Sequence, residues 1–202
     1  MIKDLSANDL DKQVTELVAK YDTSPLADEL YLVGMGQQME VKDETGRPNR
    51  YYQWLACLIK LVEPKQVVEL GAAAGISTIM MAHEMPIDSV LYSVDYDPLA
   101  WRWMMKEYPQ VRKVFGNDLD LSIYPKDCDL SKTDIWFIDS LHTGGQLQKE
   151  LVLYKPFFKK GAIVVFDDIR MPGLWEIWQK LPYDKCETTN PNHFSGFGHI
   201  VI

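Results

Sequence analysis

Short apolar runs, rich in Val, Ile and Phe, recur through the last two thirds of the chain and alternate with longer amphipathic segments. Apolar runs of this length and composition are typical of buried strands. They predict strands at residues 66–70, 89–95, 111–115, 134–139, 162–166, 184–188 and 197–202. The segments between them predict helices at residues 76–84, 98–108 and 146–158, and a further helix after Pro172.

This alternation predicts an α/β fold, a Rossmann-like, doubly wound sheet of seven strands with helices on both faces. The last two strands have no helix between them, so we expect them to form a hairpin. The final strand would then run antiparallel to its neighbours in an otherwise parallel sheet.

Residues 1–63 precede the sheet and predict an N-terminal helical extension. Apolar side chains at helical spacing, from Leu10 to Tyr21, indicate a helix over residues 8–21. A short helix is expected from Pro25, and an apolar helix over residues 50–62. The polar, glycine-punctuated stretch 34–49 is either a solvated connector or a functional loop whose Met35 and Met39 contact a small molecule. We expect one domain, 1–202, in which residues 1–63 supply helices and a substrate lid and residues 64–202 form the ligand-binding core.

A turn of small residues, Gly71-Ala-Ala-Ala-Gly75, follows the first predicted strand and precedes a helix. Glycines let a backbone approach a ligand closely, and a helix start offers free N–H donors. The spacing matches neither the dinucleotide fingerprint nor the phosphate-binding loop that ends in Gly-Lys-Ser/Thr. Glu69 stands two residues before the turn, and Asp95 ends the second strand, where a carboxylate usually binds ribose hydroxyls. A turn without a ligand and a dinucleotide site stay open as alternatives.

Glu-x-Gly-x-x-x-Gly, followed by an acid that ends the second strand, resembles the S-adenosylmethionine (SAM) site of class I methyltransferases over residues 55–202. The resemblance implies that Glu69 orders the turn or meets the amino end of SAM, and that Ser77 binds its carboxylate. Asp95 would accept from the ribose, and Asn117 or Asp118 from the adenine amino group. The implied cofactor-binding residues are Glu69, Gly71, Ala73, Gly75, Ser77, Asp95, Asn117, Asp118 and Asp139. Trp101 and Trp103 are interpreted as helix packing.

Three more acids end neighbouring strands: Asp139 follows the fourth, and Asp167 and Asp168 follow the fifth. Three carboxylates with open positions between them suit a hard octahedral cation such as Mg²⁺. The pattern resembles the metal-dependent O-methyltransferases of catechols, of acyl-CoA phenylpropanoids and of bacterial natural products. That resemblance implies that Asp139, Asp167 and Asp168 bind Mg²⁺ or another divalent cation. The alternative for Asp167-Asp168 is a cap on the following turn.

His142, three residues after Asp139, stands where the catechol type of that family has a lysine base, and Asp168 stands where it has an amide. The Asp-x-x-His form is closer to the natural-product branch. By resemblance Asp139 and His142 are catalytic, with His142 as the general base. We expect a neighbouring cation to lower the pKa of His142 below its usual value near 6.5. The alternative is a polar residue at a helix start.

Composition narrows the choice of partners. A net charge of −8 argues against a nucleic-acid substrate. No apolar stretch approaches transmembrane length, and three widely spaced cysteines favour reduced thiols and a cytoplasmic protein. We therefore expect an enzyme that acts on a small molecule, with neither nucleic acid nor membrane as partner; a homodimer stays open.

The function predicted from the sequence is SAM-dependent O-methylation of a catechol or a vicinal diol, such as a natural product. An NAD(P)-binding oxidoreductase and a non-catalytic SAM-binding module are the alternatives.

Overall fold

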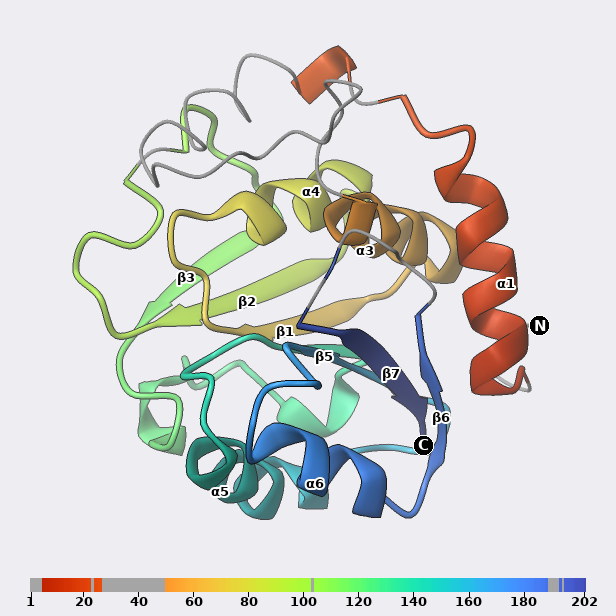
Figure 1. The fold of residues 1–202 in the computed structure, drawn as a ribbon. Helices are drawn as coiled ribbons and strands as arrows, with labels where there is room; N and C mark the ends of the chain where they lie inside the picture. The colour runs from red at the N-terminus through yellow and green to blue at the C-terminus, as the bar shows by residue number, and fades with distance from the viewer. Residues whose placement is uncertain (1–4, 23, 27–49, 103, 189–192, 194) are drawn as a thin grey trace.

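A mixed β-sheet forms the middle layer of the protein in the computed structural model, which describes residues 5–22, 24–26, 50–102, 104–188, 193 and 195–202 (Figure 1). Within these residues seven strands pair in the order β3-β2-β1-β4-β5-β7-β6. Their bounds are β1 Gln66–Leu70, β2 Val90–Asp95, β3 Val111–Phe115, β4 Ile135–Ile138, β5 Ile163–Asp167, β6 Asp184–Glu187 and β7 Phe197–Val201. Strand β7 is antiparallel to both β5 and β6, which confirms the predicted hairpin and the reversed last strand.

Helices cover both faces of this sheet (Figure 1). Helices α3 (Arg50–Val62) and α4 (Ile76–Glu84) lie on one face, and α5 (Gly144–Tyr154) and α6 (Leu174–Lys180) on the other. The short 3₁₀ helices are η2 Ser24–Leu26, η3 Leu121–Ile123, η4 Leu130–Lys132 and η5 Lys155–Phe157. Side chains alternate across a strand, so Val67 belongs to the core under α3 and α4 whereas Val68 belongs to the core under α5 and α6. Both faces of the central strands are therefore buried.

The first helix, α1 (Ala7–Val18), packs against α3 and the β6–β7 end of the sheet. Polar contacts fix its start: the Ala7 N–H donates to Asp184, and the buried imidazole of His199 donates from Nε2 to the Ala7 carbonyl at 2.9 Å. The Trp54 indole donates to Asp11 within the helix. The helix predicted over residues 8–21 is thus confirmed with an earlier end, whereas the stretch 34–49 with Met35 and Met39 lies outside the described residues. No described helix has the length and apolar character needed to cross a membrane.

The helix predicted over residues 98–108 is wrong, because the described residues between β2 and β3 form turns. Trp101 explains the difference. Its backbone adopts a left-handed conformation, φ 58°, its N–H donates to the Ala73 carbonyl, and its indole donates to the Ser93 hydroxyl at 2.8 Å. These contacts anchor Trp101 on the turn after β1 and override the local preference for helix. The interpretation of Trp101 as helix packing is therefore wrong, and Trp103 lies outside the described residues.

Candidate active site

The turn between β1 and α4 is built around two glycines with positive φ, Gly71 at 87° and Gly75 at 93°. A Cβ on Gly71 would lie 2.0 Å from the carbonyl oxygen of Asp139, so no larger residue fits where this turn packs on the end of β4. A Gly71→Val substitution would therefore disturb the fold as well as the ligand site, because its side chain would meet the backbone of Asp139.

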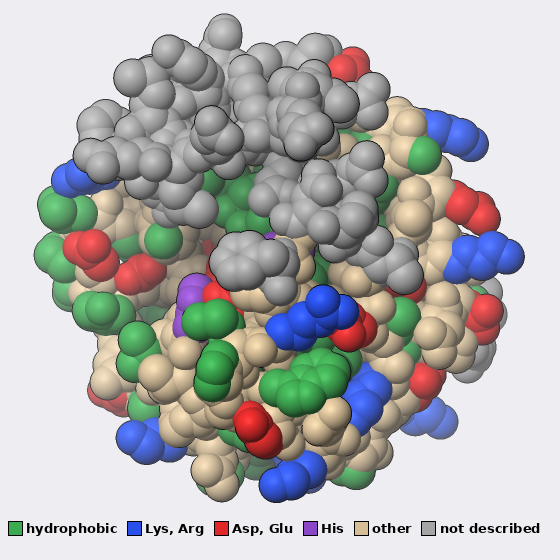
Figure 2. Space-filling view, viewed as in Figure 1, with side chains coloured by type: hydrophobic (Ala, Val, Ile, Leu, Met, Phe, Trp, Pro, Cys, Tyr) green, Lys and Arg blue, Asp and Glu red, His purple; other side chains and the backbone are tan. Residues whose placement is uncertain are grey.

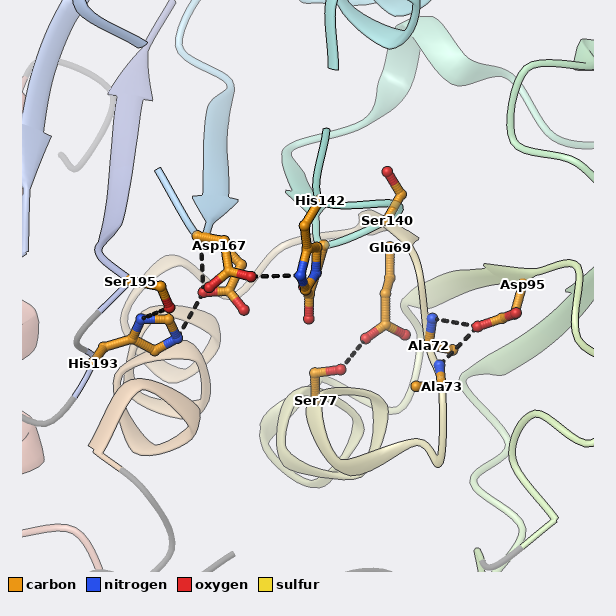
Figure 3. A network of polar contacts seen from close by, with 12 residues as sticks. Glu69, Ala72, Ala73, Ser77, Asp95, Ser140, His142, Asp167, His193 and Ser195 are labelled. Carbon is orange, nitrogen blue, oxygen red and sulfur yellow. Dashed lines mark hydrogen bonds and ion pairs between the residues drawn. The ribbon is translucent and has the colours of Figure 1, made fainter. Parts of the chain in front are cut away.

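Glu69 is fully buried beneath this turn. Its carboxylate accepts a hydrogen bond from Ser77 at 2.5 Å (Figure 3). It also accepts from Thr78 at 2.6 Å and from Ser93 at 2.5 Å. Burial raises the pKa of Glu69, and the three hydroxyl donors oppose that shift by stabilising the carboxylate. Of the two roles left open for Glu69, the structure shows the ordering of the turn. The Ser77 hydroxyl is directed to Glu69, and its contact with a cofactor stays a prediction.

Asp95 ties the end of β2 to the same turn. Its Oδ2 accepts from the backbone N–H groups of Ala72 at 3.0 Å and Ala73 at 2.7 Å (Figure 3), and its Oδ1 accepts from the Asp97 N–H at 2.8 Å. The carboxylate is only partly buried, so its remaining lone pairs face the edge of the sheet where a ligand binds in this class of fold. We call Glu69, Asp95 and the turn 71–75 the cofactor half of the site.

Asn117 and Asp118 follow β3, which pairs with β2, so they lie at the same edge of the sheet. The Asn117 side chain accepts from the Leu119 N–H, and Asp118 accepts from the Gln146 amide at 2.9 Å. Contact of either residue with adenine stays a prediction.

Glu150 joins this region to the end of β4 and was not predicted from the sequence. The fully buried carboxylate accepts from Gln146 at 2.9 Å and from the Ser140 hydroxyl, and its Oε2 has no hydrogen-bond partner among the residues that the structure describes. Burial raises its pKa to about 7. A glutamate on an amphipathic helix ordinarily faces solvent, so the sequence carried no signal for its position.

The acids at the ends of β4 and β5 form the second part of the site, which we call the acidic half: Asp139, Asp167 and Asp168. The two strands pair in parallel, with Ile138 opposite Phe166, so Asp139 and Asp167 leave the sheet side by side. Consecutive strand residues normally point to opposite faces. Asp168 breaks this alternation with a left-handed backbone, φ 56°, and its N–H donates to Asp167 at 2.9 Å.

His142 bridges two of these carboxylates (Figure 3). Its Nε2 lies 3.1 Å from Asp139 and its Nδ1 lies 2.5 Å from Asp168. Hydrogen bonds to Asp139 and Asp168 raise the pKa of His142 to about 10, because both carboxylates stabilise the imidazolium. The shift is opposite to the predicted one, which assumed that a cation faces the ring. Burial and the charge of Asp167 raise the pKa of Asp139, an effect that His142 partly offsets.

His193 is a second histidine in the acidic half and was missed in the sequence analysis. Its Nε2 lies 2.8 Å from Asp167, and only 9% of its side chain is exposed. Burial lowers the pKa of His193, but the bond to Asp167 outweighs burial and the net shift is upward. The predicted reversal of the last strand could have located it. Strand β7 runs antiparallel to β5, with Phe197 opposite Asp167, so the residues just before β7 return to the edge where β5 ends.

The acidic half has donors that fit a divalent cation. Among the described residues, the metal-ligating side chains whose donor atoms all lie within 4.8 Å of one another are Asp167, Asp168 and His193. Asp139 is outside that group, but it stands beside Asp167 and is connected to Asp168 through His142. The ion-pair partners of these acids are two histidines, His142 and His193.

Both halves of the site open on one edge of the sheet. Figure 3 follows this edge from His193 and Asp167, past His142, to Glu69, Ser77 and Asp95. The edge reaches the surface, since 45% of the His142 side chain is exposed, and histidine and acidic side chains gather near the middle of the face shown in Figure 2.

Comparison with known sequences agrees with this geometry. The sequence pattern of the family described as methyltransferase domain matches residues 68–169, just over half of the chain. The match spans the turn after β1, all three acids of the acidic half and the strands between them. The chain therefore belongs to the methyltransferase-domain family. It is a class I SAM-dependent methyltransferase.

Solved structures share the complete fold at low sequence identity. A proposed O-methyltransferase from Klebsiella pneumoniae superposes with a TM-score of 0.68 at 18% identity, over 94% of this chain and 95% of that one. A proposed caffeoyl-CoA O-methyltransferase from Staphylococcus aureus has a TM-score of 0.68 at 18% identity, over 95% and 98%. An O-methyltransferase from Bacillus cereus in complex with SAH has a TM-score of 0.63 at 16% identity, over 100% of both chains.

Proposed function

We propose that this methyltransferase transfers the methyl group of SAM to a hydroxyl oxygen of a small molecule that carries two adjacent oxygens, as a catechol or a vicinal diol does. One observation carries the proposal: Gly71 of the cofactor half packs directly on the backbone of Asp139 of the acidic half. A cofactor on the turn and an acceptor at the acids would therefore lie side by side. The similar folds of proteins described as O-methyltransferases support the choice of oxygen.

The cofactor half would bind SAM with groups already in place. Backbone N–H groups at the start of α4 would face its carboxylate, Asp95 would accept from the ribose hydroxyls, and Asp118 from the adenine amino group. Because Glu69 fixes the first residues of α4 and Asp95 fixes the turn, these groups need little reorganisation when the cofactor binds.

The acidic half would prepare the acceptor. A divalent cation would be held in this half, with Asp167 and Asp168 among its ligands, and when bound it would lower the pKa of a hydroxyl and orient it. The hydroxyl oxygen attacks the methyl carbon in line with the sulfur, the carbon–sulfur bond breaks, and its electrons neutralise the sulfonium. His142 takes the hydroxyl proton. A cation held at Asp168 would lower the pKa of His142, because only Asp139 would then stabilise the imidazolium, and His142 would then act as the base.

Calorimetry and a methyl-transfer assay test the proposal together. We expect SAM to bind the wild-type protein, and Asp95→Asn to weaken binding by about 1–3 kcal/mol through lost hydrogen bonds to ribose. Labelled methyl should pass to a catechol or a vicinal diol and not to the matched compound with one hydroxyl. Absence of SAM binding, or transfer to amines alone, would refute the proposed function.

A further inference from the structure

We propose that the divalent cation of the acidic half is held by Asp167, Asp168 and His193, and that this donor set of two carboxylates and one imidazole favours a first-row transition metal such as Co²⁺, Ni²⁺ or Fe²⁺ over Mg²⁺. Asp139 then serves as the partner of His142 on the side that faces the cofactor. The role of this cation in methyl transfer rests on the proposed function, whereas the assignment of its ligands does not.

The distances fit ligands of one ion. Neighbouring ligands of an octahedral ion with bonds of about 2.1 Å lie about 3 Å apart. The His193 Nε2 and the Asp167 Oδ1 are 2.8 Å apart, and Asp168 offers an oxygen within 4.8 Å of both. Small rotations of the side chains are thus enough to place three donors on one face of an ion.

The backbone conformation of Asp168 brings the carboxylates of Asp167 and Asp168 to the same edge of the sheet. Adjacent residues of an extended strand direct their side chains to opposite faces, which would separate the two carboxylates. The left-handed conformation of Asp168, φ 56°, turns the chain so that both acids meet the same histidine-lined edge. A non-glycine residue in this conformation costs free energy, and such residues concentrate at functional sites.

The imidazole of His193 is held as a metal-bound histidine requires. A ligating ring generally donates from its second nitrogen to a neighbouring acceptor, which fixes the ring orientation. The His193 Nδ1 lies 3.3 Å from the Ser195 hydroxyl, and Ser195 in turn hydrogen-bonds to Asp168. The Tyr51 ring packs edge-on against the imidazole with a centroid separation of 4.5 Å. Because Nδ1 faces Ser195, the Nε2 atom near Asp167 is the nitrogen that would bind the ion.

Asp139 makes its main contacts outside this group of donors. Its carboxylate pairs with the His142 Nε2 at 3.1 Å, and Gly71 of the cofactor half packs against its backbone. Its donor atoms are not part of the compact group that contains His193. Asp139 is therefore a positioning residue that orients His142. A cation held by Asp167, Asp168 and His193 would keep open coordination positions for a substrate with two oxygens.

The donor types decide which metal is preferred. Carboxylates and water suit Mg²⁺, whereas an imidazole nitrogen adds affinity for Fe²⁺, Co²⁺ and Ni²⁺ in the order of the first-row series. A set of Asp139, Asp167 and Asp168 would supply oxygen alone and would favour Mg²⁺ or Mn²⁺. The change in metal affinity when His193 or Asp139 is replaced therefore distinguishes the two ligand sets without any assay of turnover.

The experiment is a titration of the chelator-treated full chain with Mg²⁺, Mn²⁺ and Co²⁺ by calorimetry, with the visible absorption of bound Co²⁺ as a second readout. Wild type should bind Co²⁺ more tightly than Mg²⁺. His193→Ala should lose more Co²⁺ affinity than the roughly 10–100-fold that loss of an outer partner costs, whereas Asp139→Asn should stay within that range. His193→Asn, which restores an oxygen donor, should recover Mg²⁺ binding relative to His193→Ala.

His83→Ala, which removes a histidine remote from the site, is the matched control and should bind Co²⁺ as wild type does. SAM binding and thermal unfolding, measured on the same samples, show that each variant folds and keep this test separate from the methyltransferase proposal. Preference of wild type for Mg²⁺, or a larger loss of Co²⁺ affinity in Asp139→Asn than in both His193 variants, would overturn the inference even if SAM binds normally.

Discussion

The two halves of the active site stabilise their carboxylates by different means. In the cofactor half, hydroxyl and backbone N–H donors of the same chain surround Glu69 and Asp95. In the acidic half, Asp139 and Asp167 stand next to each other, and histidines are the partners of the cluster. Neutral donors form a permanent part of the fold, whereas adjacent carboxylates repel unless cations accompany them. Folding alone therefore satisfies the carboxylates of the cofactor half, whereas those of the acidic half are satisfied fully only when a cation binds.

Four predictions test this contrast, ordered by their expected effect on the free energy of unfolding. Gly71→Ala should have the largest effect, about 3–5 kcal/mol, because the new Cβ would meet the Asp139 carbonyl at 2.0 Å and the residue would keep a positive φ. Denaturant unfolding measures the loss. Gly145→Ala, at a position where a Cβ meets nothing within 4 Å, is the control. Equal stability of the two variants would contradict the packing of the turn on β4.

Glu69→Gln should cost about 2–4 kcal/mol, because an amide accepts more weakly than a carboxylate and brings buried donors among three hydroxyl donors. Denaturant unfolding again measures the change, and SAM affinity should fall with it because the turn is less well fixed. Asp97→Asn, on the exposed loop after β2, serves as a control for removal of an acid. A Glu69→Gln protein as stable as wild type would place the ordering of the turn elsewhere.

The pH dependence of stability should reveal His142. A histidine whose pKa is raised by folding stabilises the protein below its unfolded pKa, near 6.5, and this contribution is lost as pH rises through the folded value of about 10. Chelator-treated wild type should thus lose stability between about pH 6.5 and pH 10 relative to His142→Gln. Parallel stability curves of the two proteins across this window would show that the bridge between Asp139 and Asp168 is not maintained in solution.

Asp139→Asn should leave stability within about 1 kcal/mol of wild type or increase it, because the change removes a repulsive partner of Asp167. Methyl transfer should nevertheless fall by about 10²–10⁴-fold, since His142 loses the carboxylate that orients it. A large loss of stability would mean that Asp139 is structural, like Glu69. The two acid-to-amide variants together therefore measure the difference between the halves.

The sequence was informative where local pattern and structure coincide. The central strands are buried on both faces, so their apolar runs gave the strands and the sheet correctly, and the spacing of Gly71 and Gly75 located the turn that Glu69 and Asp95 support. The helix expected at residues 98–108 failed because a contact distant in space, the Trp101 indole on Ser93, decides the backbone there. His193 and the upward pKa shift of His142 depend on how separate strands meet, which no local pattern contains.

The contact between His199 and Ala7 constrains the order in which the chain can fold. The two residues are 192 positions apart, and the imidazole, whose pKa burial lowers to about 4, is neutral and donates to a carbonyl at the start of α1. Helix α1 leaves the ribosome well before its partners β6 and β7, which lie far along the chain. Docking of α1 therefore has to wait for these strands, and a nascent chain stopped before β7 leaves α1 without the surface against which it packs.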